Sequence, residues 1–378
     1  MNWKQTLFWS FSAAAIFYYF LLFGVFVFVG QEEMQLFIPE WWYIREFLFQ
    51  PGGFCAVAGQ WIIQYYRQPM SAVVFHTVLL VGCGFMVYRI LRCFSDKTYL
   101  LFLSLLPVLY LVKMSIHGEY LVDGTVGVVL MLLALSVSLK VRRAGSIAGY
   151  GIASTLFLCG LTGLLSVCYA FLYTLLALLR YKTSRQRLAA SACLIPALFI
   201  YLFSGWLGIP VPLSDGWMPE AYLEIQRLPH YYMYRVWTFF TLSIVGVALF
   251  ARFVPVIGEK SKWMDRVALV CLITVLVSIR FCLPEPWHAQ RMMLDELSFL
   301  ARERQWDAII DKYRGKQIYN YVSLNYLNMS LAHKGELADR MFTFDQKGTK
   351  SLCRLESDLL HGSFIERCSF SCWRCLFV

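Results

Sequence analysis

Repeated apolar runs constrain the fold of this chain more than any other sequence feature. A helix that crosses the hydrocarbon core of a bilayer needs roughly 20 apolar residues. About nine such runs occur, at 6–29, 70–92, 98–114, 120–140, 147–162, 164–180, 188–207, 234–254 and 264–282. The composition agrees, since 59% of the residues are hydrophobic and only 15% are charged, unlike a soluble globular domain. The sequence predicts an all-α, polytopic transmembrane helix bundle.

Basic residues predict the orientation of this bundle, because cytoplasmic connections carry an excess of Lys and Arg. They follow every second run: Arg89, Arg92, Lys97, Lys140, Arg142, Arg143, Arg180, Lys182, Arg185, Arg187, Lys260 and Lys262. This alternation requires the chain to reverse near Gly160, Thr162 and Gly163, so we predict two short spans there rather than one long helix. We expect a bacterial inner-membrane protein with a cytoplasmic N-terminus and a periplasmic C-terminus.

The first outer loop, residues 30–69, is richer in carboxylates and aromatics than a simple connection requires. Its sequence includes QEEMQLFIPEWWYIREFLFQPGG. Trp41, Ile44 and Phe47 recur at helical spacing, which predicts amphipathic interfacial helices. Pro51, Gly52 and Gly53 would break them. We therefore expect the loop to lie along the membrane surface.

The C-terminal part has the composition of a soluble region and contains two similar stretches. LARERQWDAIIDKY (300–313) and LAHKGELADRMFTF (331–344) are offset by about one tetratricopeptide period. The region resembles tetratricopeptide helical hairpins, with simple helix pairs as the alternative. We divide the chain into a transmembrane domain (1–283), an extracytoplasmic helical-repeat-like region (284–348) and an irregular tail (349–378). The tail lacks periodicity and suggests truncation or a shifted reading frame.

Candidate functional residues gather on the predicted outer face. Glu32 and Glu33 follow the first span, where desolvation would raise a carboxylate pKa toward the range of a general base. Solvated helix-end charges are the alternative. Basic residues suited to a lipid phosphate are Arg67, Lys113 and Arg280, with salt bridges as the alternative. The remaining candidates share the acidic outer face with the first loop and are predicted to bind substrate: His117, Glu119 and Asp123.

Several other sites and classes are less favoured. His76 lies inside a span, where we expect a neutral imidazole that hydrogen bonds a neighbouring helix. The spacing of Cys353, His361, Cys368, Cys372 and Cys375 does not fit a paired zinc site, so no metal is predicted. No cofactor is predicted either. The basic clusters lie between apolar runs, so we expect membrane lipids rather than nucleic acid as partners.

The N-terminal region resembles the glycosyltransferase C superfamily, membrane enzymes that use polyprenyl-phosphate sugars. The corresponding parts are Glu32 and Glu33, the aromatic stretch 41–49, Pro51 to Gly53 and the span from about residue 70. The resemblance implies that Glu32 or Glu33 deprotonates an acceptor hydroxyl, although the usual acidic pair of the family contains an Asp. The chain resembles more closely uncharacterised Bacteroidota membrane proteins with C-terminal helical repeats, which implies architecture only.

Two other functions remain open at the level of sequence. The spans would serve as an anchor if residues 284–348 recruit a periplasmic protein partner. A transporter would show inverted repeats and interrupted helices with polar residues at the bilayer midplane.

Overall fold

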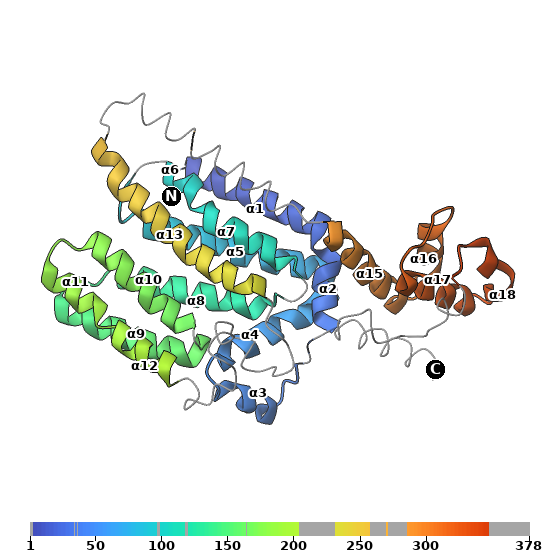
Figure 1. The fold of residues 1–378 in the computed structure, drawn as a ribbon, viewed down its shortest axis with the longest axis horizontal. Helices are drawn as coiled ribbons and strands as arrows, with labels where there is room; N and C mark the ends of the chain where they lie inside the picture. Colours follow the sequence, from blue (N-terminus) through green and yellow to red (C-terminus); the bar gives the residue numbers. More distant parts are fainter. Residues whose placement is uncertain are drawn as a thin grey trace. The chain divides into compact units, whose positions relative to one another are not determined.

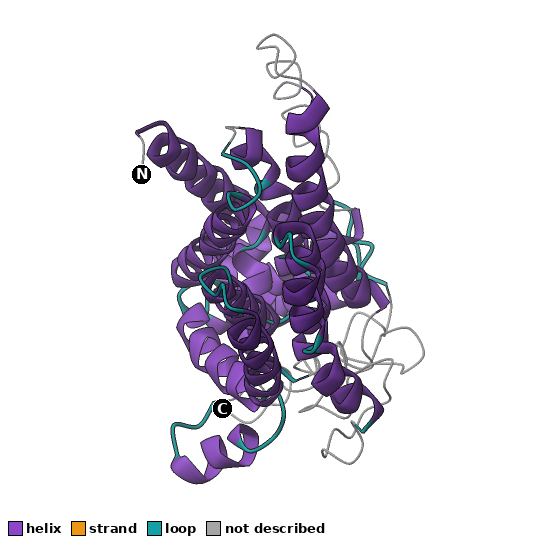
Figure 2. Ribbon diagram, turned by 90° about the vertical axis from the view of Figure 1, so that its left-hand side faces the viewer, coloured by secondary structure: helices purple, strands orange, loops and turns teal. Residues whose placement is uncertain are grey.

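The computed structural model describes residues 3–33, 35, 37–96, 99–117, 120–163, 165–203, 231–257, 270 and 286–347. Within these ranges the regular elements are all helices, and no strand occurs (Figure 2). The chain forms two compact units, which we call the N-terminal unit (Met1–Glu285) and the C-terminal unit (Pro286–Val378).

The first half of the N-terminal unit begins with a long helical path. Its elements are α1 (Trp3–Phe23), α2 (Val25–Glu33), α3 (Trp41–Leu48), α4 (Gly53–Ile63), η1 (Gln64–Arg67), α5 (Pro69–Leu91), α6 (Tyr99–Leu103) and α7 (Leu105–Ser115). Helices α1 and α2 continue each other, because Gly24 N donates to Phe20 O and Phe28 N donates to Gly24 O. Pro69 opens α5, where its missing N–H removes no helical hydrogen bond.

The second half contains a helical hairpin at the predicted reversal. Its elements are α8 (Val122–Ser138), α9 (Ala144–Thr162), α10 (Leu165–Arg180), α11 (Ser184–Ser191), α12 (Leu194–Leu202) and α13 (Tyr231–Ile257). Gly163 follows α9 with a φ of 63°, a conformation that glycine adopts readily. The Tyr173 hydroxyl donates to Ile147 O at 2.9 Å, across the hairpin. The chain therefore turns back here, as two helices.

Length and apolarity identify fewer membrane spans than the sequence runs suggested. Among the described residues, three helices are long and apolar enough to cross a bilayer: α1, α5 and α9. Four of the other runs form shorter apolar helices, at Tyr99–Ser115, Val122–Ser138, Leu165–Arg180 and Phe239–Arg252. The predicted run at 264–282 lies almost entirely outside the described residues. These three helices are fewer than the nine or so spans that the sequence predicts.

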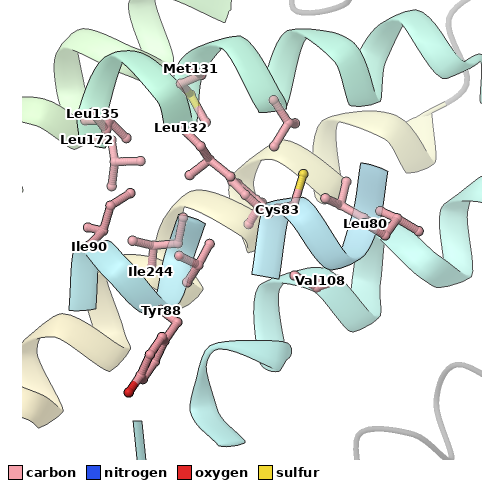
Figure 3. Close-up of a cluster of buried hydrophobic side chains, with 14 of the residues drawn as sticks. Leu80, Cys83, Tyr88, Ile90, Val108, Met131, Leu132, Leu135, Leu172 and Ile244 are labelled. Atoms are coloured by element: carbon pink, nitrogen blue, oxygen red, sulfur yellow. The ribbon is translucent and has the colours of Figure 1, made fainter. Parts of the chain in front are cut away.

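Helix α5 lies at the centre of the N-terminal unit. It packs against α1, α2, α7 and α8, and to a smaller extent against α13 (Figure 1). Figure 3 shows Leu80 and Cys83 of α5 facing Met131 and Leu132 of α8. These side chains are buried, so the core excludes solvent along most of the length of α5.

The C-terminal unit has its own hydrophobic core. Its elements are α15 (Pro286–Arg302), α16 (Trp306–Tyr313), α17 (Tyr321–His333), α18 (Leu337–Arg340) and η3 (Met341–Thr343). Leu297, Ile309, Leu324, Leu327 and Leu331 are buried together. Asn320 caps α17 by accepting a hydrogen bond from Val322 N at 2.8 Å, as expected for an N-cap residue.

Helices α15 and α17 end in the same way. Each is followed by a residue with a left-handed backbone, Arg304 with a φ of 56° and Gly335 with a φ of 72°. The closing bonds run from Arg304 N to Ala301 O, Gln305 N to Leu300 O, Gly335 N to Ala332 O, and Glu336 N to Leu331 O. This is the Schellman arrangement, and the two copies lie at matching positions of the two similar sequence stretches.

Candidate functional site

One end of the N-terminal unit contains a cluster of buried polar side chains, which we call the junction: Gln31, Tyr66, His76, His117 and Asp123. Gln31 lies in the last turn of α2 and is fully buried. Its Nε2 donates to the backbone oxygens of His117 at 3.3 Å and Tyr120 at 2.8 Å. The end of α2 is therefore fixed to the turn between α7 and α8.

Asp123 lies in the first turn of α8, next to Gly59 of α4. Only 4% of its surface is exposed. Its Oδ1 accepts a hydrogen bond from Gly124 N at 2.8 Å, and the N-terminal end of a helix favours a negative charge. A Cβ on Gly59 would lie 2.7 Å from the Cβ of Asp123. The absence of a side chain at Gly59 thus allows α4 to approach this carboxylate.

Tyr66 lies in η1 and is fully buried. Burial raises the pKa of its phenol well above the usual value, and the negative charge of Asp123 adds to the effect. Tyr66 is therefore protonated throughout the physiological range and can donate a hydrogen bond, but it cannot act as a base. Among the described residues, its hydroxyl has no hydrogen-bond partner.

His76 stacks on an aromatic side chain rather than bonding a neighbouring helix. Its ring and that of Phe28 are 4.1 Å apart with an interplanar angle of 11°. Neither ring nitrogen has a hydrogen-bond partner in the described part of the chain. The predicted interhelical hydrogen bond is thus not present there, because the imidazole is enclosed by the rings of Phe20, Phe28 and Tyr66.

The two predicted catalytic carboxylates differ in environment. Glu32 is half-buried and Glu33 is exposed, both at the end of α2. Because Gln31 anchors this turn to the backbone of His117 and Tyr120, Glu32 lies at the same end of the bundle as His117 and Asp123. The exposed position of Glu33 does not provide the desolvation that we expected of a general base.

Two of the three predicted basic residues lie at the junction end, and the third is outside the described residues. Lys113 is half-buried in the last turn of α7, and Arg67 is exposed at the end of η1, next to Tyr66. Glu119 and Arg280 lie outside the described residues, as do Cys353, His361, Cys368, Cys372 and Cys375. The described candidates therefore lie at one end of the N-terminal unit: Glu32, Arg67, Lys113, His117 and Asp123.

The first loop divides into a surface helix and a buried helix. In α3, Trp41 and Trp42 are exposed and no residue is fully buried. In α4, Cys55, Ala56 and Ile63 are buried, and the helix packs against α8 and α9. The backbone bond from Gly52 N to Gly160 O, 3.1 Å long, ties the start of α4 to the end of α9. The loop is thus not a surface segment throughout, because α4 is packed within the N-terminal unit.

Sequence reasoning missed Gln31 and Tyr66. Gln31 had a usable signal, since it is an amide placed between an apolar run and two carboxylates. Tyr66 had none, because a tyrosine near the end of a membrane span is ordinarily read as an interfacial side chain.

Comparison with family models matches residues 1–372 to a family of unknown function, DUF6057. The match includes both units and most of the region 349–378. No curated protein and no solved structure matches the chain. Because the family match spans nearly the whole sequence, the chain belongs to DUF6057.

Proposed function

We propose that this chain is an integral membrane protein that transfers a sugar from a polyprenyl-phosphate donor, with the junction end of the N-terminal unit as its reaction end. The observation that carries the proposal is the pair of hydrogen bonds from Gln31 to His117 O and Tyr120 O. They hold the turn that carries Glu32 beside the segment that carries His117 and Asp123.

The outer surface of the helices supports the membrane part of this proposal. Large apolar side chains are exposed on several helices of the N-terminal unit: Phe11, Val78, Phe157, Leu198 and Leu242. Soluble monomers rarely expose large apolar patches, whereas lipid-facing helices require them. We propose nine spans in a bacterial inner membrane, the shorter ones formed by the shorter apolar helices, with a cytoplasmic N-terminus and a periplasmic C-terminus.

The chemistry assigns different roles to the residues at the junction end. Glycosyl transfer requires a base for the acceptor hydroxyl and cations for the lipid phosphate. We assign the base to Glu32, which is half-buried, in preference to the exposed Glu33. Arg67 and Lys113 would hold the phosphate, and His117 and Asp123 the sugar or acceptor hydroxyls. Glu119 and Arg280 retain the roles expected from the sequence.

Binding of a polyprenyl-phosphate sugar, measured by native mass spectrometry, tests the phosphate site. We expect Arg67→Ala and Lys113→Ala to weaken binding. Arg92→Ala is the matched control, because Arg92 lies at the opposite end of α5 and pairs with Asp96 at 3.1 Å. An absence of binding to the unaltered protein would overturn the proposal.

Turnover of the same donor tests the base. Removal of a general base lowers a rate by about 100-fold or more, so we expect that loss in Glu32→Gln and near-normal turnover in Glu33→Gln. Equal activity in both variants and in the unaltered protein would exclude Glu32 as the base.

A second function is favoured by the C-terminal unit. Its separate core and its two matching helix ends suit a tetratricopeptide-like surface for a periplasmic protein partner. On this alternative, a chain that ends at residue 285 would still bind lipid but would no longer be cross-linked to a protein in intact cells. Unchanged cross-linking would exclude it.

A further inference from the structure

Two basic connections lie side by side at the end of the N-terminal unit opposite the junction. Asp123 lies in the first turn of α8 and Leu139 directly follows its last residue, so these two residues mark opposite ends of one helix. The connection after α8 and the connection after α10 are joined by three hydrogen bonds. They run from Arg180 Nη2 to Leu139 O (2.6 Å), Tyr181 OH to Val141 O (2.9 Å) and Gln186 Nε2 to Arg142 O (2.8 Å).

These bonds bring together cations that have no acidic partner among the residues the structure describes. The six exposed cations are Lys140, Arg142, Arg143, Lys182, Arg185 and Arg187. Segments 139–143 and 180–191 contain no Asp or Glu, and none of the six forms an ion pair with any residue the structure describes. In addition, Arg180 Nη1 is buried and has no hydrogen-bond partner among those residues. The cluster therefore has unused donors for an anion.

An exposed apolar strip begins within the same cluster. Leu188 of α11 lies between Arg187 and the end of the helix and is 76% exposed. Exposed side chains of α12 include Ile195, Leu198, Phe199 and Leu202. These lie at positions i, i+3, i+4 and i+7 and hence on one side of the helix. The cationic cluster and the exposed apolar side chains are therefore consecutive along α11 and α12.

We propose that this surface binds an anionic phospholipid, with its phosphate on Arg142, Arg185 and their basic neighbours and an acyl chain along the exposed side of α12. Guanidinium groups hold phosphate oxygens without needing deprotonation. Charge alone would accept any phosphate, whereas the adjoining apolar strip selects one that carries a hydrocarbon chain. The site shares no residue with the junction, so lipid binding here does not depend on the proposed glycosyl transfer and is tested separately from it.

The test titrates the full chain in detergent with a phosphatidylglycerol, a phosphatidylcholine of the same acyl chains, and inorganic phosphate, and counts bound lipid by native mass spectrometry. We expect saturable binding of phosphatidylglycerol, weak binding of phosphatidylcholine and no displacement by millimolar phosphate. Each basic residue near an anionic surface strengthens binding about fivefold, so Arg142→Gln with Arg185→Gln should weaken binding by about 30-fold. Displacement by inorganic phosphate would overturn the lipid assignment.

Two further variants separate the headgroup from the chain. Leu198→Ser with Leu202→Ser should lower phosphatidylglycerol binding and leave the preference over phosphatidylcholine unchanged. Arg314→Gln with Lys316→Gln in the C-terminal unit removes the same charge elsewhere and should have no effect. If this control variant weakens phosphatidylglycerol binding as much as Arg142→Gln with Arg185→Gln does, binding depends only on the overall charge of the protein. That result would refute the site.

Discussion

The helix ends at Arg304 and Gly335 share one backbone geometry but carry different residues. A left-handed conformation costs a residue with a Cβ about 1 kcal/mol or more, and glycine much less. We expect Arg304→Gly to stabilise the C-terminal unit by about 1 kcal/mol and Gly335→Ala to destabilise it by a similar amount. No atom lies within 4 Å of a Cβ placed on Gly335, so the effect there is one of backbone strain.

Hydrogen exchange of α15 and α17 amides in the full chain measures both changes. Slower exchange in Arg304→Gly and faster exchange in Gly335→Ala are the expected outcomes. The same direction of change in both variants would contradict the assigned backbone geometry.

His76 allows a second prediction at the scale of one side chain. Its nitrogens are buried without described hydrogen-bond partners, and a buried unsatisfied polar group costs about 1–3 kcal/mol. His76→Phe keeps an aromatic ring against Phe28 and should raise the free energy of unfolding by about 1 kcal/mol. Phe28→Ala, which removes the stacking partner, should lower it by about 3 kcal/mol. Thermal unfolding in detergent gives both values, and a destabilised His76→Phe would reveal a bonded imidazole.

The contact between α4 and α8 depends on the absence of a side chain at Gly59. A Cβ there would lie 3.0 Å or less from three atoms of Asp123, two of which belong to the backbone. We expect Gly59→Ala to destabilise the N-terminal unit by about 2 kcal/mol. Gly82→Ala is the control, because a Cβ at Gly82 meets nothing within 4 Å and alanine favours a helix by about 1 kcal/mol. Similar unfolding temperatures for the two variants would argue against the close packing of α4.

Sequence patterns predicted the helices better than their packing. The reversal between α9 and α10 was indicated by Gly163, which is a local signal, and by the alternation of basic connections along the chain. The place of α4 was not predictable in this way. Its sequence, GFCAVAGQWII, suits an interfacial helix as well as a packed one, and only the pairing of Gly59 with Asp123 decides between them. Likewise, the apolar runs predict that helices form, but they do not predict the helix lengths. Several of these helices are shorter than the thickness of a bilayer.

For the molecule as a whole, the two ends of the N-terminal unit should face opposite sides of the membrane. We expect a membrane-impermeant maleimide to label Glu46→Cys in intact cells and to label Ser184→Cys only after lysis. Both residues are exposed, and the background would have its 12 native cysteines replaced. Labelling of both variants in intact cells would refute the proposed orientation.

The candidate site was predictable in outline at this scale, but not in detail. Placing Glu32, His117 and Asp123 on one face followed from the alternation of connections, which is a property of the whole chain. The burial of Asp123 depends on how α4 packs against α8, and the anchoring role of Gln31 on how α2 meets the turn before α8. Such contacts join residues far apart in sequence, and a single sequence carries no local signal for them.

The unequal lengths of the helices have a consequence for the surrounding lipid. At about 1.5 Å per residue, α8 and α10 are about 25 Å long, whereas the continuous path from α1 into α2 is about 45 Å long. The hydrocarbon core of a typical bilayer is about 30 Å thick. A bilayer that meets the short helices must thin on that side, and one that meets the long path must thicken or let the helix tilt. A change in acyl-chain length should therefore strain the hydrogen bonds that join Gln31 of α2 to the turn before α8.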